Sequence, residues 1–289
     1  MADKAFALAK RQGFDGLRWQ KMTDNDGNES PSSVGAFLIW QQPHFIYMAE
    51  LLYRSKPTSQ ILNKYKELLF ATADFMASFP SYNAQTKKYN LGKGLIPAQE
   101  CFDAVKTFNP TYELAYWSWA LEVAQQWKKR LGLGREKKWD EIINNLAPLP
   151  QANAVYLATE STPDCYSDTS KYLVDHPAVL GAYSSIPAAN GLDTVVMKNT
   201  FDLVWKIWKW DDTWGAACVF MYSRFLLLSF GLTAIVKVYS GVPAWRLQLR
   251  LWLAESRQSG AGDKPAAAGE RLHGGLGHLG YRSITNRPR

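Results

Sequence analysis

The sequence predicts an all-α fold, arranged as a toroid or barrel of paired helices. Segments with helical apolar spacing, or with helix-starting and helix-ending residues, recur along residues 2–209. Strand patterns are sparse over the same range. Long polar loops separate the long helices, which favours an α/α toroid over a simple bundle with short connections.

The first elements are a short amphipathic helix over 2–12 and a long polar loop over 13–29, which is dense in turn-forming residues. A mostly apolar helix is predicted over 35–54. Pro43 either kinks this helix or opens it as its first residue, since proline lacks the N–H that an interior position needs.

The next helix is predicted over 58–79. Thr58 or Ser59 starts it and Pro80 stops it. The connection that follows, 81–99, is predicted to be a loop with possible short strands.

A long helix to about Leu131 follows the dipeptide Asn109-Pro110. We expect Asn109 to be the N-cap and Pro110 the first helical residue, with Glu113 in the first turn, where it favours the helix dipole. Gly132 ends the helix.

The remaining predicted elements are a short helix over 137–146, a loop over 150–175, and two helices over 177–186 and 191–209.

The net charge of +7 arises entirely in the last quarter of the chain. Residues 1–215 hold 23 basic and 23 acidic residues, whereas residues 216–289 hold 10 basic and 3 acidic ones. The basic residues change from mostly Lys to mostly Arg at the same place. No nucleic-acid-binding motif accompanies them, so a nucleic-acid partner is not expected.

The composition therefore divides the chain into a helical domain, 1–215, an apolar helical segment, 216–254, and a disordered basic tail, 255–289. Membrane insertion of the apolar segment is not expected, because its uninterrupted apolar core, 225–236, has 12 residues and a span needs about 20. We expect either that the reading frame changes near residue 215 or that the gene model is truncated.

No cofactor or metal is predicted. The three cysteines, Cys101, Cys165 and Cys218, form no CxxC pair, and phosphate-binding, dinucleotide-binding and zinc-hydrolase motifs are absent. The first residues contain no secretory signal, and the localisation stays open.

Glu100 is the most informative residue for function. It lies in a short non-helical segment just before the aromatic-rich helix. Loop carboxylates beside aromatic rings are typical of sugar-cleaving sites, where an acid reaches the glycosidic oxygen and flat rings hold the sugar. The alternative is an ordinary surface acid before a core helix.

Several segments, in this order, resemble the catalytic domain of glycoside hydrolase family 65 and its relative, family 95. They are GlyLeuArgTrp (16–19) with the acidic loop after it, the segment 30–47, ProAlaGlnGlu (97–100) with the following helix, AspHisProAlaValLeuGlyAlaTyr (175–183) and TrpAspAspThrTrpGly (210–215). The resemblance covers about residues 3–215. Within this clan, the sequence is most similar to a bacterial branch.

This resemblance implies an (α/α)6 barrel that is incomplete here, with about four of the six helical hairpins. It implies a β-sandwich domain before the first segment in the relatives, which are periplasmic or secreted. The sequence after residue 215 is unlike the family, which makes 216–289 a non-homologous tail.

The resemblance also implies an inverting reaction with Glu100 as general acid. Its partner, at a carboxyl separation of about 6.5–9.5 Å, would be Asp211, with Asp212 as the fallback. Capping of a helix start before Thr213 explains this pair equally well. Glu113 is a weaker acid candidate, because the helix dipole already explains a first-turn Glu.

Candidate substrate contacts follow from the same segments. Each has a structural alternative: an aromatic residue at helical spacing is more often core, a histidine can be internally hydrogen-bonded, and Arg18 can pair with Asp15. Trp40 and Trp119 are further candidates for stacking on sugar, with the same structural alternative of a core position. The predicted contacts are Arg18, Trp19, Glu29, Gln41, His44, Trp117, His176 and Asp212.

Two functions are consistent with these observations. One is a fragment of an inverting glycosidase that acts on an oligosaccharide or glycoside. The other is a non-catalytic carbohydrate-binding or interaction remnant of the same fold. The sugar, the choice between hydrolysis and phosphorolysis, and the oligomeric state stay open.

Overall fold

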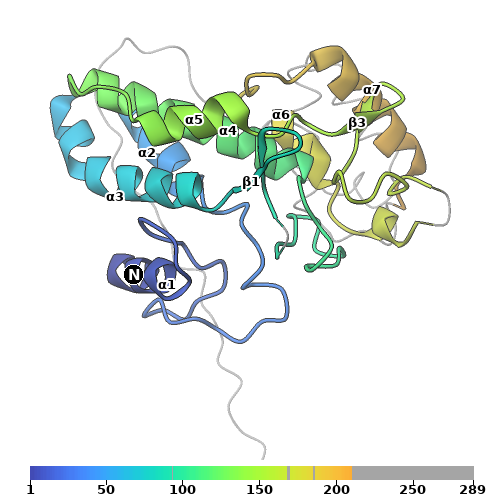
Figure 1. Cartoon of the computed structure of the whole chain (residues 1–289), viewed down its shortest axis with the longest axis horizontal. Helices are drawn as coiled ribbons and strands as arrows, with labels where there is room; N and C mark the ends of the chain where they lie inside the picture. The colour runs from blue at the N-terminus through green and yellow to red at the C-terminus, as the bar shows by residue number, and fades with distance from the viewer. Residues whose placement is uncertain (93, 168–169, 185, 210–289) are drawn as a thin grey trace, which may run out of the picture. The chain divides into compact units, whose positions relative to one another are not determined.

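The computed structural model describes residues 1–209, except residues 93, 168–169 and 185 (Figure 1). This part of the chain is largely helical, as predicted. Its α-helices are α1 (Ala2–Arg11), α2 (His44–Ser55), α3 (Ser59–Ser78), α4 (Thr111–Arg130), α5 (Lys137–Asn145), α6 (Gly181–Ser184) and α7 (Thr194–Ile207), and its 3-10 helices are η1 (Lys171–Val174) and η2 (Ala178–Leu180).

Two small antiparallel hairpins interrupt the helices. Strand β1 (Ser81–Asn83) pairs with β2 (Lys88–Asn90), and β3 (Gln151–Ala152) pairs with β4 (Val155–Tyr156). The predicted boundary at residue 215, the segment 216–254 and the tail 255–289 lie outside the described residues, and the closure of a barrel stays a prediction.

Helix α4 is the central element of the core. It packs against α2, α3, α5 and α6, and Figure 1 shows α2 to α5 side by side. Buried residues occur on all of its faces, and the rings of Trp117 and Trp127 are fully buried. A helix buried all round is an interior helix, so α4 positions whatever is attached to its first turn.

A buried carboxylate joins α2 to α4. Glu50 accepts hydrogen bonds from Arg130 at 2.5 and 3.1 Å and from the indole N–H of Trp127 at 2.7 Å. Arg54 donates a further bond at 2.7 Å. Burial raises the pKa of Glu50, but these donors outweigh burial and leave the pKa below its ordinary value.

The loop after α1 is fixed to α3 by a close backbone approach. The amide of Leu17 donates to the carbonyl of Ala71 at 3.1 Å. Gly16 has φ of +64°, and a Cβ at this position would lie 2.0 Å from the Ala71 carbonyl oxygen. Only glycine satisfies both conditions, so Gly16 sets the course of this loop.

The predicted helix over 35–54 is wrong in its first half. Residues 33–37 and 40–43 form turns, and between them Leu38 makes a parallel bridge with Ile96. Pro43 is the N-cap of α2, so it opens the helix rather than kinking it. Proline disfavours helical geometry in the residue before it, which separates the apolar turns from the helix.

The predicted cap of α4 is also wrong by one residue. Asn109 has φ of +49°, and Pro110 is the N-cap, with no side-chain cap bond. The side chain of Asn109 instead accepts from the amide of Leu91 at 2.9 Å and donates to Glu160 at 2.7 Å. Asparagine tolerates this left-handed conformation, and its amide group is used to join two loops.

The other helix starts and stops agree with prediction more closely. Thr58 caps α3 by accepting from the amide of Ile61, and Gly132 follows α4 with φ of +72°. The predicted loop over 150–175 contains β3, β4 and η1. The predicted helix over 177–186 consists of a 3-10 turn and four α-helical residues.

In the part of the chain that the structure describes, no helix is long and apolar enough to cross a membrane.

Candidate active site

The segment that carries Glu100 is held beside two other loops. Ile96 pairs with Leu38, and its amide donates to the carbonyl of Phe37 at 3.0 Å. Glu100 then accepts a hydrogen bond from the ammonium group of Lys21 at 3.4 Å. About a quarter of each of these two side chains is exposed, 27% for Glu100 and 24% for Lys21. A carboxylate and an ammonium group therefore reach solvent together.

An aromatic wall extends from Lys21 into the core. It consists of Trp40, His44, Tyr47, Tyr116 and Trp119, whose rings follow one another at centroid distances between 5.0 and 6.4 Å. The ammonium group of Lys21 lies 5.9 Å from the centroid of the Trp40 ring. Trp40, His44 and Tyr47 are part-exposed, whereas Tyr116 and Trp119 are buried behind them. The Glu100–Lys21 pair thus stands at one end of a cluster whose part-exposed rings suit the flat face of a sugar.

His44 is neutral near neutral pH. Burial lowers its pKa to about 4, because the charged ring would lose its hydration. Its Nδ1 atom lies 2.9 Å from the hydroxyl oxygen of Tyr116, and the tautomer decides which of the two donates. The predicted contact His44 therefore belongs to the aromatic wall as an uncharged hydrogen-bonding group.

Glu113 is the buried acid beneath this site. It is fully buried in the first turn of α4, and its Oε1 atom accepts from the amide of Ala98 at 2.6 Å. Its Oε2 atom has no partner among the described residues. Burial raises the pKa of Glu113 to about 7, although the bond from Ala98 lowers it.

Arg18 belongs to the core rather than to a sugar site. It donates to Gln12 at 2.6 Å and to the carbonyl of Ala36 at 2.7 Å, and only 6% of it is exposed. The predicted alternative, a pair with Asp15, is also wrong, because Asp15 pairs with Lys138. The N–H donors of Arg18 join the end of α1 to the turns before α2.

Trp117 is likewise a core residue. Its ring is fully buried, and its N–H donates to the carbonyl of Met76 at 2.7 Å. A fully buried ring offers no face to a ligand, so the structural alternative holds for this position.

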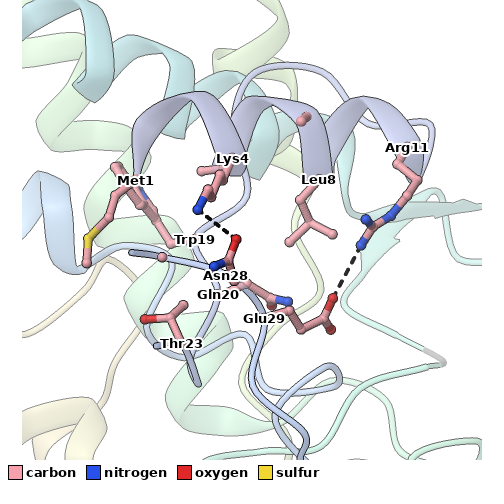
Figure 2. Close-up of a pocket in the computed structure, with 12 residues that line it drawn as sticks. Met1, Lys4, Leu8, Arg11, Trp19, Gln20, Thr23, Asn28 and Glu29 are labelled. Atoms are coloured by element: carbon pink, nitrogen blue, oxygen red, sulfur yellow. Dashed lines mark hydrogen bonds and ion pairs between the residues drawn. The ribbon is translucent and has the colours of Figure 1, made fainter. Parts of the chain in front are cut away.

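Trp19 and Glu29 lie at a separate pocket of about 270 Å³ beside α1 (Figure 2). Trp19 stacks on Phe45 at 5.4 Å, and Glu29 pairs with Arg11 at 3.3 Å. Figure 2 shows Glu29 and Arg11 at one end of this pocket and Met1 at the other. None of the residues at the Glu100 site lines it, so the structure separates these two predicted contacts from the acid.

Gln41 lies between these two regions. Its amide nitrogen donates to the carbonyls of Trp19 and Leu38, each at 3.0 Å. Its oxygen is buried and, among the described residues, has no hydrogen-bond partner. The amide nitrogen of the predicted contact Gln41 therefore has a structural role.

His176 lies in the turn after η1, with its Nε2 atom 4.0 Å from Asp175. Gln99 links this region to the acid segment, since its amide donates to the carbonyl of Tyr172 at 2.8 Å. The hydrogen bond from Gln99 thus holds the segment before His176 beside the segment of Glu100. Asp211 and Asp212 lie outside the described residues.

Lys21 and Tyr116 are site residues that the sequence reasoning missed. Lys21 precedes its partner Glu100 by 79 positions, and no spacing rule relates the two. The only signal was the position of Lys21 two residues after Trp19, in a segment already predicted to face substrate.

Within residues 1–209 as described, no group of three or more His, Cys, Asp or Glu residues could hold a metal ion. The prediction that no cofactor is used stays a prediction.

Comparison with known proteins gives a distant structural similarity. No protein-family model matches the chain, and no curated protein matches it. Among solved structures, the chain is similar to a "Putative kojibiose phosphorylase from human microbiome", with 14% sequence identity and a TM-score of 0.47. The match covers 58% of this chain and 23% of that one, so this chain spans about a quarter of the neighbour's length.

Proposed function

We propose that this chain is part of a carbohydrate-active enzyme that cleaves a glycosidic bond with inversion, with Glu100 as the general acid. The observation that carries the proposal is the position of Glu100, a part-exposed loop carboxylate at the end of the aromatic wall. The order of segments that resembles glycoside hydrolase families 65 and 95 supports the same assignment.

The chemistry assigns a role to each group. Glu100 donates its proton to the glycosidic oxygen as the bond to the leaving sugar breaks. Trp40 offers a ring face to the sugar, and neutral His44 offers a hydrogen bond to a hydroxyl without adding charge. The base that activates water or phosphate is Asp211 in this proposal, with Asp212 as the fallback.

One observation favours the second candidate, a non-catalytic sugar-binding protein. In the described structure Glu100 accepts a hydrogen bond from Lys21, and an acid catalyst has to donate one. A ligand that displaces Lys21 resolves this difference, whereas a stable pair makes Glu100 a binding group only.

The substitution Glu100→Gln separates the two candidates. The full chain is assayed against a panel of disaccharides with and without inorganic phosphate, and sugar binding is measured by calorimetry. An acid role predicts a loss of cleavage by about 10²–10⁴-fold with sugar affinity retained within a few-fold.

Glu67→Gln is the matched control, because Glu67 is an exposed carboxylate on α3. It should leave both cleavage and binding unchanged. A wild-type chain that binds sugars and cleaves none of them would support the binding protein. Cleavage that survives Glu100→Gln would contradict the acid assignment.

A further inference from the structure

Glu113 is a carboxyl group whose position the helix dipole does not explain. A first-turn glutamate that only balances a helix dipole lies at the surface, where its charge stays hydrated. Glu113 is 0% exposed, and its helix begins with no side-chain cap. Burying a carboxyl group in this way costs free energy unless the group makes a bond that the fold uses.

The bond that Glu113 makes is to the acid segment. Its Oε1 atom accepts from the amide of Ala98 at 2.6 Å, and Ala98 precedes Glu100 by two residues. Gln99, between them, is 1% exposed and donates to the carbonyl of Tyr172. The backbone just before Glu100 is therefore fixed on both sides, and α4 supplies one of the two anchors.

We propose that Glu113 is a positioning residue for Glu100, because its carboxyl group holds the acid segment to the rigid helix α4 through the amide of Ala98. The proposal rests on the proposed function only in naming Glu100 as the acid. The anchoring of the segment itself is independent of activity.

The anchor changes strength with pH. Because burial raises the pKa of Glu113 to about 7, its carboxyl group changes charge near neutral pH. A carboxylate accepts a stronger hydrogen bond than a neutral acid does. Because the cost of burying the carboxylate outweighs this gain, and opening the segment returns water to Glu113, the acid segment is held less tightly above pH 7 than below it.

Other titratable and charged groups lie on the elements that pack against this anchor. Burial lowers the pKa of His44 to about 4 and raises the pKa of Tyr112 and of Tyr116 above their ordinary value, so these three groups stay uncharged near neutral pH. The remaining groups on the neighbouring elements are Lys21, Tyr47, Glu100, Cys101, Tyr172, Asp175 and His176.

Hydrogen–deuterium exchange of the peptide over residues 96–102, in the full chain, tests this anchor without an activity assay. Glu113→Leu keeps the approximate volume and removes the acceptor. At pH 6 it should raise exchange of this peptide by about tenfold or more, in line with the cost of leaving the buried amide of Ala98 without an acceptor. Gln125→Leu is the matched control, because Gln125 is equally buried in α4 and bonds to the α5 side, at Glu136 and Asp140. It should leave the peptide unchanged.

Glu113→Gln covers the case in which the leucine variant does not fold. Glutamine keeps a neutral acceptor at every pH, so exchange of the wild-type peptide should match that of the variant below pH 6 and exceed it above pH 8. Taking the ratio of the two exchange rates at each pH removes the intrinsic pH dependence of exchange and the contributions of all groups that the two proteins share. A ratio that is constant from pH 6 to 8, or an unchanged peptide in a folded Glu113→Leu variant, would overturn the proposal.

The two proposals fail separately. Loss of anchoring with cleavage unaffected by Glu100→Gln would reject the acid and keep the anchor. Unchanged exchange with cleavage lost in Glu100→Gln would reject the anchor and keep the acid.

Discussion

Burial shifts the pKa values of Glu113 and His44 in opposite directions. Both side chains lose their contact with water, and burial favours the neutral form of each. Below pH 7 the inner side of the site is therefore lined by uncharged groups, whereas Glu100 and Lys21 lie at its part-exposed edge.

The raised pKa of Glu113 predicts how stability depends on pH. The ordinary value is 4.5 and the folded value is about 7, so between these values the folded state holds a proton that the unfolded state has lost. The contribution of Glu113 to stability is thus largest below pH 4.5 and is lost as the pH rises through 7. Compared with Glu113→Gln, the wild type should lose up to roughly 3 kcal/mol of unfolding free energy between pH 5 and pH 8.

Urea denaturation of the two proteins at several pH values measures this difference. The comparison with the isosteric variant cancels the contributions of all other titrating groups. A difference between the two proteins that does not change with pH would show that Glu113 keeps an ordinary pKa in the folded chain.

At the scale of elements, the loop over 13–19 is fixed by glycine. Gly16→Ala should destabilise the chain by more than about 1 kcal/mol, because the residue has positive φ and its Cβ would meet the Ala71 carbonyl. Gly134→Ala is the control, since Gly134 has no positive φ and open space around it. Thermal unfolding of both variants measures the effect, and equal melting temperatures would contradict this account of the loop.

The elements also show what the sequence could predict. The starts of α1, α3 and α5 depend on local signals, and the sequence located them to within a residue or two. The turns over 33–37 and 40–43 could not be predicted, because Leu38 between them is held by its bridge to Ile96, far along the chain. Asn109 was misread for the same reason: its partners at Leu91 and Glu160 outweigh its local preference to cap α4.

The candidate site was predictable in part. Glu100 and the aromatic residues on α2 and α4 could be found from their types and order. The burial of Trp117 could not, since periodicity does not tell an interior helix from one that lines a cavity. The burial of Arg18 could not either, because its partners Gln12 and Ala36 are brought to it by the tertiary fold. The pair of Lys21 with Glu100 depends on the tertiary fold alone.

For the whole molecule, an apolar strip on α2 bears on behaviour in solution. Met48, Leu51 and Leu52 are 59%, 48% and 45% exposed and lie three and four residues apart on one helix. Adjacent exposed apolar side chains favour association. We expect the full chain to self-associate with increasing concentration.

Sedimentation velocity checks this expectation. Leu51→Lys should shift the population toward monomer, whereas Leu133→Lys, at an exposed leucine on the loop after α4, should not. A wild-type chain that stays monomeric at high concentration would contradict the prediction.

The acid role of Glu100 is tested most directly by varying the leaving group. A general acid is needed when the departing sugar is a poor leaving group, and it is not needed when the departing group is a stable anion such as dinitrophenolate. Cleavage rates of Glu100→Gln and wild type are therefore compared on a disaccharide and on the dinitrophenyl glycoside of the same sugar. The account predicts a loss of about 10²–10⁴-fold on the disaccharide and a much smaller loss on the activated glycoside. An equal loss on both substrates would contradict the assignment of Glu100 as the acid.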